Sequence, residues 1–228
     1  MLTLAIDTST PVGGVALFDS DSGLRGEIRL GIKRTHSEQV MKSIDFLLDN
    51  SRTGFNEIDF YTIAIGPGSF TGLRVGLSTV KGLSFATNKP IVAVSTLEAF
   101  TPSFPFTEKL ICPLLDARKK EVYGGLFRWT EAGLRKLVPE AAFDIKSILA
   151  LIKEETIFTG SGATLYKDAI LNTLGEKARF PGENLMHPLP SALCIIGLQK
   201  AEKGEFSDPV KLTPTYLRTS EAEIKIKT

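Results

Sequence analysis

Short runs of apolar residues alternate with turn-forming residues along the first part of the chain. The runs LTLAI, VGGVALF and GEIRLGI are separated by DTSTP and DSDSGL, and this spacing predicts three short strands joined as an antiparallel meander. Apolar positions then predict a helix over 37–50, a strand over 60–65, a helix over 71–86 and a strand over 91–94. The expected order is β-β-β-α-β-α-β.

The helix over 37–50 carries both a start signal and a buried face. Thr35 and Glu38 have the spacing of a capping box, in which each side chain bonds the backbone of the other. One face at helical period is made of the apolar residues Val40, Met41, Ile44, Leu47 and Leu48.

A second lobe is expected after the segment TPSFPFTE, where prolines and aromatic residues interrupt the pattern. The elements expected there are a hairpin over 109–127, helices over 144–154, 163–174 and 191–203, and a strand over 156–160. This order loosely repeats that of the first lobe, without a strong sequence repeat. We therefore predict two α/β lobes, residues 1–104 and 105–228.

Composition narrows the class of protein. The chain has 228 residues, 43% hydrophobic and 23% charged, which indicates a folded globular protein. Lys and Arg number 27 against 26 Asp and Glu, giving a net charge of +1. A nearly neutral chain lacks the global field that draws a protein to nucleic acid or an anionic membrane, so autonomous tRNA or DNA binding is not favoured.

The residues that most often catalyse or bind metal are scarce. Cys112 and Cys194 stand among aliphatic residues, which is typical of small buried side chains. Only His36 and His187 are available, and both HExxH and GxSxG are absent, so we expect no metal site and no nucleophile. The N-terminus has no signal-peptide pattern and no apolar run has membrane-spanning length, so a cytoplasmic protein without a membrane partner is expected.

The segment IDTST places Asp7, Thr8 and Ser9 at the end of a strand. Such a strand end can cradle a phosphate. A turn in which Asp7 hydrogen-bonds its own backbone explains the same residues, and the chemistry alone favours that turn.

The segment GPGSFTGLRVG follows a strand and opens a helix, a setting in which backbone N–H groups can bind an anion. It matches neither nucleotide-binding template, because a Walker A loop needs Gly-Lys-Ser/Thr and the dinucleotide motif needs a third glycine where Thr71 stands. Within the helix, small residues form one stripe, namely Gly72, Gly76, Thr79, Gly82 and Ala86. Such a stripe permits close approach either of the protein's own sheet or of a helix from another subunit.

Two further turns are candidates for a ligand site, one without glycine and one rich in glycine. A phosphate-gripping hairpin needs glycine at its tip, but the hairpin after Asp116 carries Arg118, Lys119 and Lys120, which favours a solvated turn. Gly160 and Gly162 lie at a strand-to-helix turn that could touch a nucleotide, although such turns are common without a ligand.

Six segments together resemble the bacterial TsaB (YeaZ) family of tRNA threonylcarbamoyladenosine biosynthesis proteins. They are IDTST, THSEQVM, IGPGSFTGLRVGLSTVKGL, VSTLEAF, LLDARKKEVYGGLF and PTYLR. The resemblance is dense up to residue 128 or so and sparse afterwards. It implies the ASKHA fold of actin-like ATPases and sugar kinases, an α/β fold of two duplicated lobes with mixed sheets flanked by helices.

The resemblance also implies a non-catalytic role in tRNA modification. The family pairs with the paralogue TsaD, which transfers a threonylcarbamoyl group to adenosine 37 of tRNA, and the ATPase TsaE joins them. Homodimers form through the same face as the TsaD complex. The two metal-binding histidines of TsaD have no counterpart here. No cofactor is expected to bind tightly, ATP binding is expected to be weak or limited to the assembled complex, and tRNA is reached only through the complex.

The resemblance assigns sites residue by residue. The partner face is expected to contain His36, Glu38, Met41, Ile44, Leu48, Gly72, Arg74, Gly76, Thr79 and Gly82. A vestigial nucleotide site would contain Asp7, Thr8, Ser9, Gly160 and Gly162. Two alternatives stay open: an ATPase or small-molecule kinase that uses Asp7, and a homodimeric chaperone-like module. The role of Tyr216 and Arg218 in the C-terminal tail is not assigned.

Overall fold

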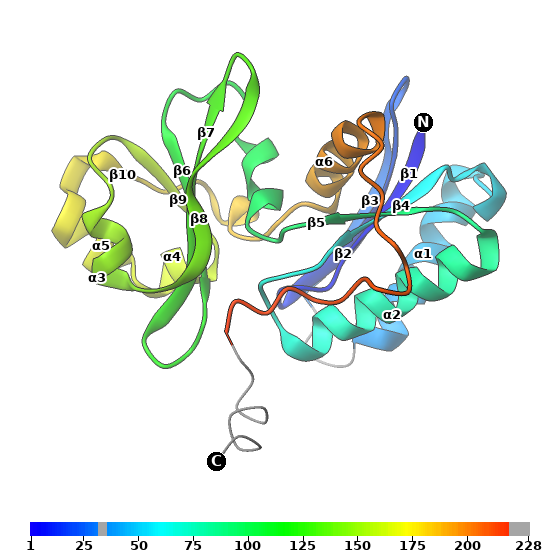
Figure 1. The fold of residues 1–228 in the computed structure, drawn as a ribbon, viewed down its shortest axis with the longest axis horizontal. Coiled ribbons are helices and arrows are strands. Elements are labelled where there is room, and N and C mark those ends of the chain that lie inside the picture. The colour runs from blue at the N-terminus through cyan, green and yellow to red at the C-terminus, as the bar shows by residue number, and fades with distance from the viewer. Residues whose placement is uncertain (32–35, 219–228) are drawn as a thin grey trace. The chain divides into compact units, whose positions relative to one another are not determined.

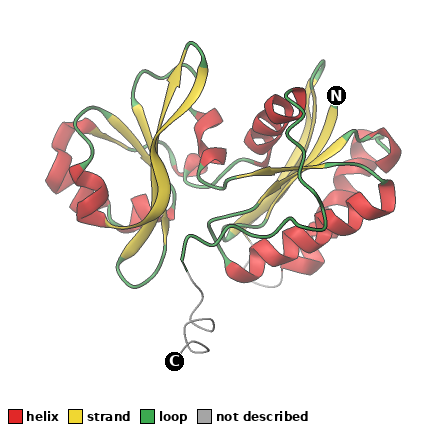
Figure 2. Ribbon diagram, in the orientation of Figure 1, coloured by secondary structure: helices red, strands yellow, loops and turns green. Residues whose placement is uncertain are grey.

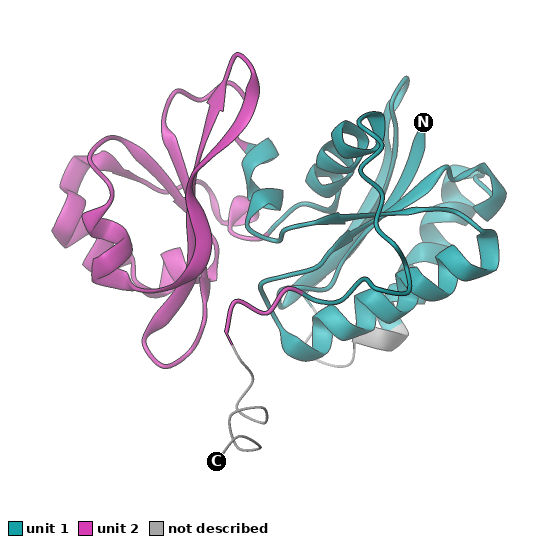
Figure 3. Ribbon diagram, in the orientation of Figure 1, with its two compact units in different colours: residues 1–103, 188–214 teal, residues 104–187, 215–228 magenta. Residues whose placement is uncertain are grey.

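The computed structural model describes residues 1–31 and 36–218, with the backbone alone for 36–38. The chain forms two compact units (Figure 3). The first contains Met1–Ser103 together with Pro188–Pro214, and the second contains Phe104–His187 and the C-terminal residues from Thr215. Figure 2 shows that each unit combines a sheet with helices.

The first unit is built on a five-stranded sheet of order β3-β2-β1-β4-β5 (Figure 1). Its strands are β1 (Leu2–Asp7), β2 (Val12–Asp19), β3 (Gly23–Gly31), β4 (Phe60–Ala64) and β5 (Ile91–Val94). Its helices are α1 (His36–Ser51), α2 (Phe70–Thr87) and α6 (Pro190–Glu202). The first three strands form the predicted antiparallel meander, whereas β4 and β5 run parallel to β1.

Different helices cover the two faces of this sheet. Side chains alternate along β1, so Leu4 and Ile6 join a buried cluster with α1 and α2, whereas Ala5 joins a cluster with α6. Ala5 pairs with Ala16 across β2, and both are fully buried. These small side chains leave room for α6 to pack closely on the sheet.

The second unit has a five-stranded sheet of order β10-β9-β6-β7-β8. Its strands are β6 (Leu110–Asp116), β7 (Glu121–Thr130), β8 (Gly133–Asp144), β9 (Thr156–Thr159) and β10 (Ala178–Arg179). Its helices are α3 (Ile145–Ala150), α4 (Ser161–Leu165) and α5 (Lys167–Leu174). Its core is a separate cluster that includes Cys112, Leu114, Phe158 and Ile170.

The two sheets have the same topology. In each, the first strand pairs antiparallel with the second and parallel with the fourth, the second pairs antiparallel with the third, and the fourth pairs parallel with the fifth. Helices flank both mixed sheets. This arrangement confirms the predicted α/β fold with two duplicated lobes.

The structure differs from the sequence prediction in three places. Residues 188–214 belong to the first unit, so the predicted division into 1–104 and 105–228 misplaces α6. The strands β8 and β10 were not predicted, and the helix expected over 163–174 is two short helices that meet at Tyr166. The predicted capping box involves Thr35, which lies outside the described residues.

Candidate functional site

The first half of α2 is docked on the end of β1 by its glycines. A Cβ atom added to Gly72 would lie 2.0 Å from the Thr8 carbonyl oxygen, and one added to Gly76 would lie 2.3 Å from Thr8 Oγ1. Thr8 Oγ1 donates a hydrogen bond to the Gly72 carbonyl (2.7 Å), and the Ser69 N–H donates to the Ser9 carbonyl (2.7 Å). The close approach predicted for the stripe is therefore made by the protein's own chain at Gly72 and Gly76.

Asp7 lies fully buried at the same strand end. Its Oδ1 accepts hydrogen bonds from the Ser9 N–H (2.8 Å) and Ser9 Oγ (2.6 Å), which is the self-bonded turn that the sequence favours. Burial raises the pKa of Asp7 to about 6, because desolvation of the carboxylate outweighs the Ser9 hydrogen bonds and the Arg29 charge. Among the residues that the structure describes, none gives Oδ2 a hydrogen bond.

Gly160 and Gly162 have a packing role in the second unit. A Cβ atom on Gly160 would lie 2.3 Å from the Leu114 carbonyl oxygen, and one on Gly162 would lie 3.0 Å from it. Gly160 also has a positive φ of 94°. These glycines let α4 approach β6, so their presence is explained without a ligand.

The hairpin between β6 and β7 adopts an unusual backbone. Arg118, Lys119 and Lys120 all have left-handed φ angles, of 63°, 52° and 65°, a region that side chains with a Cβ rarely adopt. The Arg118 N–H donates to Asp116 Oδ1 (2.8 Å). Arg218 Nη1 lies 3.2 Å from Glu121 Oε2, so the C-terminal tail contacts this hairpin within its own unit.

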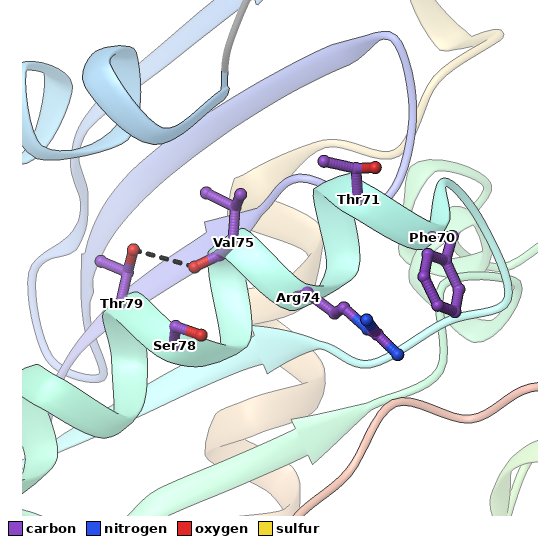
Figure 4. A pocket seen from close by; sticks show the side chains of 6 residues that line it. All are labelled: Phe70, Thr71, Arg74, Val75, Ser78 and Thr79. Atoms are coloured by element: carbon purple, nitrogen blue, oxygen red, sulfur yellow. Dashed lines mark hydrogen bonds between the residues drawn. The ribbon is translucent and has the colours of Figure 1, made fainter.

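The exposed side of α2 is opposite the docked glycines. It presents Phe70, Thr71, Arg74, Ser78, Gly82, Phe85 and Ala86 as exposed residues and Val75, Thr79 and Lys81 as half-buried ones. A groove of about 420 Å³ on this side is lined by Phe70, Thr71, Arg74, Val75, Ser78 and Thr79. Figure 4 shows these six side chains along α2. The guanidinium carbon of Arg74 lies 3.8 Å from the centroid of the Phe70 ring, so the cation stacks on an exposed aromatic face.

This side of α2 is cationic. The sequence contains no carboxylate between Asp59 and Glu98, whereas Arg74, Lys81 and Lys89 lie in that interval. A surface that combines exposed aromatic rings with cations can bind a protein that presents apolar and acidic side chains.

Comparison with known proteins identifies the family. A family model described as "TsaD: tRNA N6-adenosine threonylcarbamoyltransferase" matches residues 30–226. The Bacillus subtilis protein named tRNA threonylcarbamoyladenosine biosynthesis protein TsaB is 35% identical over 229 residues, covering 99% of this chain and 97% of that protein. The chain belongs to the TsaB family.

Another TsaB protein is similar over nearly the whole chain, and two solved structures share the fold. TsaB of Escherichia coli is 27% identical over 238 residues, covering 99% of this chain and 98% of that protein. A Pseudomonas aeruginosa protein described as similar to peptidase YeaZ superposes with a TM-score of 0.82 at 25% identity, covering 95% of this chain and 99% of that chain. The structure titled "YeaZ from Pseudomonas aeruginosa" gives a TM-score of 0.80 at 24% identity, covering 94% and 99%.

The structure brings together only part of the face predicted from the TsaB resemblance. Met41, Arg74 and Gly82 are exposed, and Thr79 is half-buried. The prediction is wrong for Ile44 and Leu48, which are buried in the core of the first unit, and for Gly72 and Gly76, which the chain itself covers. The side chains of His36 and Glu38 lie outside the described residues.

The aromatic and aliphatic residues of the exposed side were not predicted from the sequence. Phe70, Val75 and Phe85 lie at helical spacing opposite Gly72 and Gly76. If Gly72 and Gly76 are assigned to the core of the first unit, the helical period of about 3.6 residues predicts that Phe70, Val75 and Phe85 lie on the exposed side.

The part of the chain that the structure describes contains no cluster of three or more His, Cys, Asp or Glu side chains that could hold a metal ion. Burial raises the pKa of both the Cys112 and the Cys194 thiol, which keeps these thiols neutral. Within the same residues, no helix is both long and apolar enough to span a membrane.

Proposed function

We propose that this chain is a non-catalytic accessory subunit that binds and activates TsaD, the tRNA N6-adenosine threonylcarbamoyltransferase. The observation that carries the proposal is the exposed side of α2, where Phe70 and Phe85 are exposed and Arg74 stacks on the Phe70 ring. The proposed partner surface also includes Met41 on α1, which is 37% exposed. Such a surface is suited to binding a protein and holds no assignable catalytic group.

The resemblance to TsaB supplies the rest of the proposed role. TsaD transfers the threonylcarbamoyl group to adenosine in tRNA, and this chain holds TsaD in an active form in the cytoplasm. TsaE joins the pair as a third subunit. A second copy of the chain uses the same face as TsaD, so the homodimer and the TsaD complex exclude each other. The tRNA meets this chain only through the complex.

Reconstitution of the tRNA modification with and without the chain tests this proposal. We expect modification only when the chain is present, and loss of TsaD capture by at least tenfold in Arg74→Glu, because the reversed charge meets an acidic partner surface. Lys203→Glu changes another exposed cation, directly after α6, and serves as the matched control. Modification by TsaD and TsaE alone at the full rate would rule out the accessory role.

One observation favours a second candidate, an ATPase or small-molecule kinase. Asp7 Oδ2 is buried without a hydrogen-bond partner, and a ligand could supply one. The hairpin between β6 and β7 argues against this candidate. Its tip consists of three cationic residues with left-handed backbone, Arg118, Lys119 and Lys120, where a phosphate-binding hairpin needs glycine. We expect weak ATP binding by calorimetry and negligible phosphate release from the isolated chain. Turnover that Asp7→Ala abolishes would favour the kinase.

A further inference from the structure

A second groove lies at the C-terminal end of α2 and shares Phe85 with the exposed side of this helix. Its volume is about 470 Å³, and it is lined by Ser84, Phe85, Asn88, Lys89, Pro90, Pro209 and Val210. All of these residues belong to the first unit. Phe85 is 93% exposed and Val210 is 88% exposed. Two large apolar side chains so fully exposed beside one groove mark a surface that a partner covers.

The turn that carries Val210 is fixed in place. The Ser207 N–H donates to the Ile91 carbonyl (2.8 Å), which attaches this segment to the edge of β5. The Val210 N–H donates to Asp208 Oδ1 (2.8 Å), and the Leu212 N–H donates to the Asp208 carbonyl (2.9 Å). Figure 1 shows this segment passing beside α2. Val210 is therefore held outward by a turn with both ends anchored.

The opposite wall of the groove is equally well ordered. α2 ends at Thr87, and Asn88 caps it with a left-handed backbone whose N–H donates a hydrogen bond to the Ser84 carbonyl. Ser84 Oγ donates to the Lys89 carbonyl (2.6 Å), which fixes the chain after the helix. A groove whose walls are ordered before binding loses little conformational entropy when a partner docks.

The groove is continuous with the exposed side of α2. Phe85 follows Ser78 by seven residues and Thr71 by fourteen, so the three side chains lie along one face of the helix. Lys89 lines the groove, whereas the neighbouring carboxylate of Asp208 already lies 3.7 Å from Lys211. An apolar side chain flanked by carboxylates is the chemistry that fits this groove.

We propose that the subunit covering the exposed side of α2 also inserts an apolar side chain, flanked by acidic residues, between Phe85 and Val210. The inference rests on the proposed function, since it takes TsaD as the occupant. It adds the turn at residues 208–210 to an interface otherwise made of α1 and α2. Residues 208–210 then act as a second anchor, distinct from Arg74 on Phe70.

The test measures TsaD capture by variants with a carboxylate at each wall of the groove. We expect Val210→Asp and Phe85→Asp each to weaken capture at least tenfold, because each removes an apolar contact and places a carboxylate against the acidic partner residues. Val210→Leu keeps the apolar contact and should bind at wild-type strength. Phe106→Asp is the matched control, since Phe106 is 96% exposed in the second unit. All variants should melt at the wild-type temperature.

The outcomes separate this inference from the proposed function. If Arg74→Glu abolishes capture but Val210→Asp and Phe85→Asp bind at wild-type strength, the groove is not part of the interface and the inference is wrong, whereas the proposed function stands. If the wild-type chain fails to capture TsaD at all, the proposed function fails. If Val210→Asp removes only the homodimer in sedimentation, the occupant is a second copy, which also overturns the inference.

Discussion

Gly76 and Gly82 are six residues apart on α2, yet an added methyl group would meet opposite surroundings. At Gly76 it would lie 2.3 Å from Thr8 Oγ1 and 3.1 Å from Ile63 Cδ1, and at Gly82 nothing lies within 4 Å. We expect Gly76→Ala to lower the free energy of unfolding by about 1–3 kcal/mol through overpacking. Gly82→Ala should raise it by about 1 kcal/mol, the difference in helix propensity.

Urea unfolding of the two variants at one protein concentration measures these opposite signs. Both substitutions are Gly→Ala within one helix, so the change in helix propensity is the same in both. The difference between the two variants therefore reports the packing. If Gly76→Ala is as stable as the wild type but loses partner binding, Gly76 belongs to the partner face and not to the core.

Asp7 should make stability depend on pH. Its pKa of about 6 in the folded protein lies above the ordinary value of 3.8, because burial disfavours the carboxylate. The folded state thus holds this proton more tightly than the unfolded chain. The free energy of unfolding contributed by this group therefore falls as the pH rises from about 4 to about 6, by up to about 3 kcal/mol.

Asp7→Asn removes this titration and keeps an oxygen that can accept the Ser9 hydrogen bonds. We expect its stability relative to wild type to increase with pH across this interval and to be constant above it, as measured by urea unfolding at several pH values. Comparison with wild type cancels the contribution of other groups, such as Asp19, whose pKa is lowered by hydrogen bonds from Asp21 N–H and Arg25 and which acts in the opposite direction. A difference that is independent of pH would show that Asp7 titrates normally.

On the scale of a single helix, α1 separates a core face from a face open to partners. Ile44 is buried in the first unit, whereas Met41 is partly exposed. We expect Met41→Asp to leave the melting of the monomer nearly unchanged while removing the homodimer in sedimentation and TsaD in capture, because it places an unpaired carboxylate in a desolvated interface.

Two further variants of α1 give the comparison. Met41→Leu should retain both complexes, and Ile44→Asp should prevent folding, because it buries a charge among core residues. Capture of TsaD by Met41→Asp at wild-type strength would exclude α1 from the interface.

Periodicity predicted which segments of the first unit are helices and strands, but not which way α2 faces. Small residues lie on both sides of this helix, Gly72 and Gly76 toward β1 and Gly82 and Ala86 toward the outside. In the sequence these residues form one stripe at helical spacing. The packing of Gly72 and Gly76 against Thr8 separates them from Gly82 and Ala86. In the second unit, β8 was missed because GLRKLVPEAAFD alternates poorly and contains a proline, which an edge strand tolerates.

On the scale of the whole molecule, the duplication is a property of topology rather than of sequence. The order β3-β2-β1-β4-β5 recurs as β8-β7-β6-β9-β10. The return of residues 188–214 to the first unit is likewise a long-range pairing, which local patterns do not record. An apolar helix such as α6 fits any exposed sheet face, so its sequence alone does not select the first sheet.

The return of α6 gives a prediction for truncated chains. A chain ending at His187 lacks α6 and exposes the sheet face formed by Ala5, Ala16, Phe60, Val92 and Val94, which are buried in the intact protein. It also loses the hydrogen bonds from the Ser191 N–H to Glu27 Oε1 (3.1 Å) and from the Ser207 N–H to the Ile91 carbonyl. We expect this chain to aggregate or to bind a dye that reports exposed apolar surface.

A chain ending at Pro214 is the matched control, because it keeps α6 and the turn around Val210. It loses the partly exposed pair between Arg218 and Glu121, and such pairs contribute about 0–1 kcal/mol. We therefore expect it to melt within a few degrees of the full chain, with cooperative unfolding by circular dichroism. If the chain ending at His187 were instead soluble and equally cooperative, α6 would contribute little to the first unit, and the division predicted from sequence at residue 104 would describe the stability of the molecule better than the packing of α6 does.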